Sequence, residues 1–170
     1  MIISVAKLRA LAPELANISD GALQGQLEAL ESLIRKHTNN NFQKRNIRTI
    51  GRIENGALAI DYPYIKAGDT VEISRSKFND GLYVIGSSTE RTLYDEDEVL
   101  VTKIEYPADV QLGVMNLIKW ENTNRNKVGV QSETLSRHSV TYFNMDGDNS
   151  SAGYPKSLVG FLKPYMKARF

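Results

Sequence analysis

The hydrophobic period of this chain changes twice along its length. Residues 19–38 repeat apolar side chains at helical spacing, residues 49–105 alternate apolar and polar side chains as strands do, and the helical spacing returns at residue 107. The 170 residues therefore predict two kinds of structure: a helical core drawn from both ends of the sequence, and a β segment inserted between them. Such an insertion is tolerable, because the entropy of closing a loop grows slowly with its length.

Two segments carry the clearest helical stripes. The first begins at Ser19 or Asp20, either of which can cap a helix, and the second has Pro107 near its first turn. A shorter helix is expected over 4–12 and a fourth in the C-terminal tail. Two stripe positions from each long segment are expected in the core: Leu27, Leu30, Leu117 and Ile118.

The middle segment is expected to form about five or six short strands. Asn55–Gly56 between alternating residues is a strong hairpin signal, because both turn positions need positive φ, and "NDG" at 79–81 suggests another turn. We therefore expect a mainly α fold, a small bundle of about four helices with an inserted small antiparallel β module. The boundaries are 1–48 and 106–170 for the helical core with its tail, and 49–105 for the module.

Charge follows the same division. Residues 1–48 hold seven bases and four acids (+3), residues 49–105 hold six and eleven (−5), and residues 106–170 hold eight and five (+3). The net charge is only +1, whereas a dedicated nucleic-acid-binding protein usually carries a clear basic excess. No signal peptide and no membrane span are expected from the sequence.

The sequence offers little support for an enzyme. It has no cysteine and two histidines, without the spacing of a metal site, and none of the common nucleotide-binding or nucleophile motifs. The acidic run 95–98 fits a solvated turn better than a cation site, and residues 144–148 only begin like a calcium loop. We expect no catalytic residue, no cofactor and no metal, although an enzyme with an unrecognised site stays open.

The last eighteen residues, "GYPKSLVGFLKPYMKARF", are apolar and basic and follow a polar stretch at 144–153. A helix that short needs a partner surface to persist. A tail docking on a neighbouring protein would use the apolar and the basic side chains together, so the expected docking residues are Leu158, Phe161, Leu162, Tyr165, Lys163 and Lys167. The alternative is a tail packed on its own core.

A second basic cluster is formed by Lys44, Arg45 and Arg48. These side chains are expected either at subunit contacts or facing DNA. Together with the bases of 156–169, they leave open an alternative function, a nucleic-acid-binding module.

Several strings of the sequence resemble one protein family. "ISDGALQGQLEALESLIRKHTNN" and "PADVQLGVMNLIKWENTNRNKVGVQSETLSRHSVTYF" are similar to the second and third helices of head–tail connector proteins (adaptor or head-completion proteins) of long-tailed bacteriophages. "GYPKSLVGFLKPYMKARF" resembles their C-terminal tail, and "GDTVEISRSKFNDGLYVI" resembles a β insertion that some members carry.

This resemblance implies a structural, non-enzymatic virion protein. Members add to the portal protein after DNA packaging, as a ring that follows the portal's dodecameric symmetry. The next completion (stopper) protein or the tail then attaches, and double-stranded DNA passes through the lumen. The implied location is the head–tail interface of the virion, with the host cytoplasm during assembly. A chain that is monomeric alone and forms a ring only on the portal is the expected behaviour.

Overall fold

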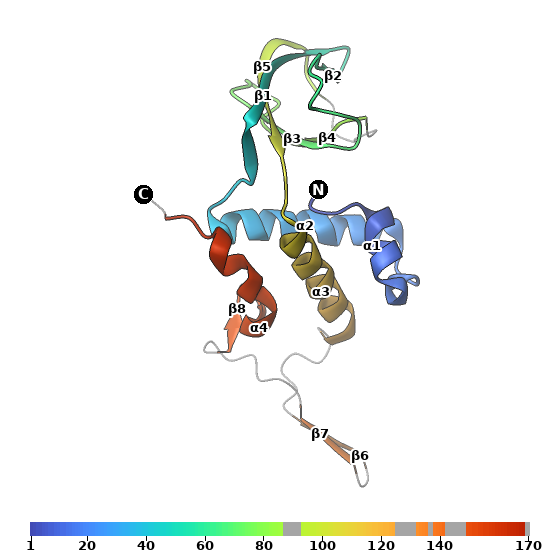
Figure 1. Ribbon diagram of the computed structural model, residues 1–170. Coiled ribbons are helices and arrows are strands. Elements are labelled where there is room, and N and C mark those ends of the chain that lie inside the picture. Colours follow the sequence, from blue (N-terminus) through green and yellow to red (C-terminus); the bar gives the residue numbers. More distant parts are fainter. Residues whose placement is uncertain (87–92, 125–131, 136–137, 142–148, 169–170) are drawn as a thin grey trace. The chain divides into compact units, whose positions relative to one another are not determined.

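A computed structural model describes the chain except for residues 87–92, 125–131, 136–137, 142–148 and 169–170, and describes only the backbone of 132–135 and 138–141 (Figure 1). The chain divides into two compact units. One is a β unit of Asn41–Tyr106 together with Met1, and the other is a helical unit of Ile2–Asn40 and Pro107–Phe170. The expected boundaries at 49 and 105 place the start of the β part eight residues later than this division does.

The helical unit is built on α1 (Val5–Leu11), α2 (Asp20–Thr38) and α3 (Ala108–Asn124), with a short 3-10 turn η1 (Pro13–Leu15) after α1. The Ser4 and Ser19 hydroxyls cap α1 and α2, and Asn39 ends α2 with a left-handed φ of 49°. These helices lie close to their expected ranges, and all four expected core residues are buried.

Arg9 fixes the connection between α1 and α2. Its guanidinium group donates to the Asp20 carboxylate at 2.6 and 2.8 Å and to the backbone carbonyls of Leu15, Ala16 and Ile18. The planar guanidinium group of Arg9 thereby binds three backbone carbonyl groups at and after the end of η1, and also the acidic residue in the first turn of α2.

The β unit is a five-stranded antiparallel sheet in the order β2-β1-β5-β3-β4. The strands are β1 (Gln43–Glu54), β2 (Ala57–Ala59), β3 (Thr70–Ser74), β4 (Gly81–Val84) and β5 (Glu96–Ile104). Asn55 and Gly56 both have positive φ, 53° and 74°, as the hairpin signal requires. The sheet has its own core: Ile53, Val71, Ile73, Tyr83, Leu93, Val99 and Val101.

The expected fold class, a mainly α bundle, is wrong. The central strands β1 and β5 span 12 and 9 residues and pair along most of their length, and the curled sheet encloses a core separate from that of the helices. Residues 43–48 of β1 are mostly polar and basic and show no apolar alternation, so the expected boundary at 49 assigns the first half of this strand to the helical core and makes the sheet too small. The chain is better described as a helical unit and a substantial antiparallel sheet.

Two further hairpins follow α3. β6 (Ser132–Leu135) pairs with β7 (His138–Thr141), and β8 (Ser150–Ser151) pairs with β9 (Tyr154–Pro155). Of the helices in the described ranges, none is both long enough and apolar enough to cross a membrane.

Candidate docking site on the helical unit

The C-terminal tail forms α4 (Lys156–Val159) and a 3-10 helix η3 (Gly160–Tyr165). Pro155 stands directly before α4 and Pro164 lies inside η3. A proline inside an α-helix removes a hydrogen bond and clashes with the preceding turn, which accounts for the change from α to 3-10 geometry. Figure 1 shows this tail, in red, beside α3 within the helical unit.

Two aromatic side chains fasten the tail to α3. The Phe161 ring packs so closely over Gly113 that a Cβ atom built on this glycine would lie 2.4 Å from the ring. The Tyr165 hydroxyl donates to the Asp109 carboxylate, 2.8 Å from each oxygen. That hydrogen bond, with smaller effects of burial and of the Asp109 charge, raises the pKa of Tyr165 above its ordinary value.

The end of α2 holds the last described residues of the tail. The Lys167 N–H donates to the Thr38 carbonyl at 2.8 Å. The side-chain amide of Asn39 donates to the Ala168 carbonyl at 2.8 Å, and that of Asn40 to the Tyr165 carbonyl at 3.1 Å. The side chains of Asn39 and Asn40, at the C-terminal end of α2, thus bind carbonyl groups of the tail.

The six expected docking residues divide into an inner and an outer set. Leu162 is buried, with 1% exposed, and Leu158, Phe161 and Tyr165 are half-buried. Lys163 and Lys167 are exposed, and so is Met166 at 53%. The tail therefore packs on its own helices, which is the second of the two arrangements that the sequence left open. Lys163, Lys167 and Met166 are among the tail residues that stay exposed to a partner.

The basic cluster of residues 44–48 lies on β1, in the other unit. The β1–β5 register shifts between Gln43 and Arg48, so this stretch bulges from regular pairing. Lys44 forms an ion pair with Glu105, and the Arg48 Nε donates to the Thr102 hydroxyl at 3.0 Å. Arg45 is exposed. Two of the three bases thus have partners within the sheet, which weakens their use as a joint phosphate-binding patch.

The acidic run 95–98 organises the loop between β3 and β4. Glu96 accepts hydrogen bonds from the Ser76 hydroxyl, the Lys77 N–H and the Asn79 side chain. The bond from Ser76 lowers the pKa of Glu96, burial opposes that change, and the bonds from Lys77 and Asn79 lower the pKa further. The Asp95 carboxylate accepts from the Gly56 N–H. Two of the four acidic residues in this run, Asp95 and Glu96, therefore serve to hold the neighbouring turns in place.

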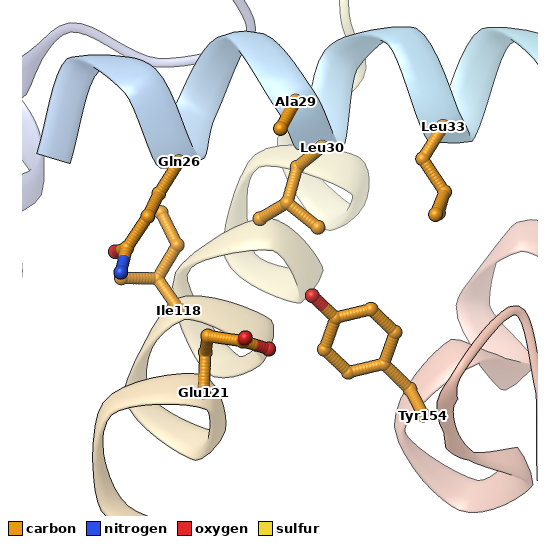
Figure 2. A pocket seen from close by; sticks show the side chains of 7 residues that line it. All are labelled: Gln26, Ala29, Leu30, Leu33, Ile118, Glu121 and Tyr154. Atoms are coloured by element: carbon orange, nitrogen blue, oxygen red, sulfur yellow. The ribbon is translucent and has the colours of Figure 1, made fainter. Parts of the chain in front are cut away.

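A small pocket opens between α2, α3 and β9, a feature that the sequence did not reveal. Its volume is about 130 Å³, and its walls are mostly apolar. Figure 2 shows Ala29, Leu30 and Leu33 projecting from α2, Ile118 and Glu121 from α3, and the Tyr154 ring with its hydroxyl directed toward α2. Trp120 packs edge-on against Tyr154, with ring centroids 5.5 Å apart.

Within the described ranges, no group of three His, Cys, Asp or Glu side chains is placed to hold a metal ion. The calcium-like residues Asn144, Asp146 and Asp148 lie outside those ranges. Comparison of the chain with protein-family models and with curated proteins finds no match.

Proposed function

We propose that this chain is a structural protein of a tailed-phage virion, a head–tail connector that adds to the portal as a ring after DNA packaging. The ring presents a surface to the next completion protein or to the tail and leaves a lumen for double-stranded DNA. The chain acts at the head–tail interface and is assembled there in the host cytoplasm.

One observation carries this proposal. The three strings that resemble the connector family lie far apart in sequence, at residues 18–40, 107–143 and 153–170. Their described parts belong to one compact unit, in which the tail packs against both α2 and α3. The string that resembles an insertion lies in the other unit. The resemblance therefore follows the physical division of the chain.

The exposed lysines of the tail are the proposed contact with the portal. Lys163 and Lys167 project from a segment that Phe161 and Tyr165 hold in place. Charges at the rim of an interface mainly set the rate and specificity of association. Arg45 and Arg48 of the second cluster are both exposed on β1, but the Arg48 side chain donates to Thr102, so Arg45 is the residue we assign to a subunit contact or to the lumen.

Head completion in vitro tests the proposal. DNA-filled heads assembled without this chain should stay tailless and should accept tails when the purified protein is added. Lys163→Glu and Lys167→Glu, singly and together, should slow this step, whereas Lys7→Glu, at an exposed lysine of α1, should not. Heads that join tails equally well without the protein would reject the function.

The same preparation addresses the alternative function. A nucleic-acid-binding module would bind DNA fragments in solution with an affinity that falls steeply as salt is raised. We expect weak binding, because Lys44 and Arg48 are engaged within the sheet.

A further inference from the structure

The loop between β3 and β4 is built around a buried polar centre. Asn79 is only 1% exposed. Its side chain accepts from the Tyr94 N–H and donates to the Tyr94 carbonyl and to Glu96, while its carbonyl accepts from the Tyr83 hydroxyl. Ser76 accepts from the Phe78 and Asn79 N–H groups. The loop is thus fixed by side chains rather than by a two-residue hairpin turn.

This fixed loop presents two large aromatic rings. Phe78 is 67% exposed and Tyr94 is 59% exposed, and their ring centroids lie 5.7 Å apart. Two rings held together outside the core form a preorganised apolar contact surface, which loses little conformational entropy on binding. We call Phe78 and Tyr94 the aromatic knob.

The charges around the knob argue against nucleic acid as its partner. Asp80 follows Phe78 by two residues, Asp95 follows Tyr94, and Asp97 and Glu98 are exposed at the start of β5. Arg75 and Lys77 offset only part of this charge. Phosphates would be repelled where aromatic stacking on bases would otherwise be favourable.

The pocket of the helical unit has the size of such a ring. An apolar cavity of about 150 Å³ is known to take up benzene, and this pocket offers about 130 Å³ between Leu30, Leu33 and Ile118 (Figure 2).

Net charge favours a contact between unlike units of two copies. Residues 41–106 hold nine bases and eleven acids, giving −2, and the remaining residues hold twelve and nine, giving +3. Contacts between two β units or two helical units would oppose like charges, whereas a β unit against a helical unit would not.

We infer that the aromatic knob of one copy inserts Phe78 into the α2–α3 pocket of a second copy. Because the knob lies on one unit and the pocket on the other, the contact between copies is head-to-tail. Such contacts form a ring when the rotation from each copy to the next adds up to a full turn. The inference specifies how neighbouring copies contact each other in the proposed ring, and it rests on the proposed function.

The contact should be weak when the protein is alone. One aromatic anchor is far less than a standard interface of about 1,600 Å². Copies bound side by side on a portal face a much higher effective concentration, so the same contact becomes populated there. The contact therefore fits the expected behaviour, a monomer when free and a ring when assembled on the portal.

Photocrosslinking of the concentrated protein tests the contact without the portal. Phe78 is replaced by p-benzoylphenylalanine, and heavy-nitrogen-labelled and unlabelled chains are mixed so that crosslinks between copies can be told from those within one. We expect crosslinks between copies that map to the peptides of α2 and α3 lining the pocket. The matched probe replaces Tyr64, an equally exposed aromatic of the same unit at 62%, and should give a background yield.

A pocket-filling variant supplies the second readout. Ala29→Phe places a ring in the pocket from an exposed helix position and should lower the crosslink yield about tenfold, as loss of a single buried anchor implies. Ala22→Phe, exposed on the same helix but outside the pocket, should leave the yield unchanged.

Any of four results would overturn the inference. The crosslinks could be confined to one chain or map outside the pocket, the yield could be no higher than that of the Tyr64 probe, or Ala29→Phe could leave the yield unchanged. A ring seen on the portal despite such a result would reject this contact and keep the proposed function. A pocket crosslink without any ring on the portal would keep the contact and reject the function.

Discussion

At the scale of single residues, Gly113 is the position where the tail most tightly limits the sequence. Gly113→Ala should destabilise the helical unit by about 1–3 kcal/mol, because the Phe161 ring has to move from the new methyl group. Denaturant unfolding followed by the fluorescence of Trp120, the only tryptophan, measures this change.

Two comparisons make the Gly113 experiment specific. Gly25→Ala on α2, where no atom beyond the neighbouring backbone of the helix lies within 4 Å of the added Cβ, should instead stabilise by about 0.5–1 kcal/mol through helix propensity. The double variant Gly113→Ala/Phe161→Ala should lose less than the sum of its single changes. Additive losses would show that the two residues do not meet.

The carboxylate of Asp69 accepts hydrogen bonds from the Lys103 ammonium at 2.6 Å and from the Lys66 N–H at 2.8 Å. Burial raises the pKa of Asp69, but the hydrogen bonds from Lys103 and the Lys66 N–H, with the charges of both lysines, outweigh it and lower the pKa. The ionised form therefore stabilises the folded β unit. This contribution is complete above the unfolded pKa of about 3.9 and is lost as the pH falls through the folded value.

Asp69→Asn should accordingly cost about 1 kcal/mol near neutral pH, a cost that shrinks as the pH falls below about 4. Hydrogen exchange of the β3 and β5 amides measures it at each pH. Asp97→Asn, at an exposed site, serves as the control. A cost that stays constant down to about pH 2 would show that the charge of Asp69 is irrelevant.

At the scale of elements, the tail is an integral part of the helical unit. Leu162→Ala should cost about 2–5 kcal/mol, because the side chain is only 1% exposed. It should also shift the Trp120 emission, since Trp120 packs on Tyr154 at the start of the tail. Lys163→Ala, the exposed neighbour, should change stability by less than about 0.5 kcal/mol. Equal effects of the two changes on stability would show that Leu162 does not lie on the buried face of the tail.

The elements also show what the sequence could predict. Helical patterns located α1, α2 and α3, with Ser19 marking the start of α2 and Pro107 that of α3, and Asn55–Gly56 located one hairpin, because each signal is local. The pairing of β1 with β5 was not predictable from local signals, since it joins residues about 50 positions apart. The sequence predicts a turn at 79–81, but the hydrogen bonds that fix this loop join Asn79 to Tyr94 and Glu96, which are 15 and 17 positions away and give no local signal. The pocket could not be predicted from the sequence, because its walls come together only when α2, α3 and β9 pack.

At the scale of the whole molecule, the two connections that enter and leave the β unit run side by side. The Glu105 N–H donates to the Phe42 carbonyl at 3.0 Å, and the Phe42 and Tyr106 rings lie 4.9 Å apart. A short Gly/Ser linker in place of residues 42–105 can therefore close the gap at little entropic cost. We expect this shortened chain to keep its helical circular dichroism and a cooperative Trp120 transition. A loss of the helical signal would show that the sheet is required for the helices to fold.

The proposed function requires that this chain form a ring on the portal. Electron microscopy of the purified protein mixed with the portal protein of the same phage tests it most directly. We expect an added ring, with the symmetry of the portal, stacked on the portal's narrow end, and no rings from the protein alone. Portal particles that look the same with and without the protein, under conditions that keep both folded, would contradict it.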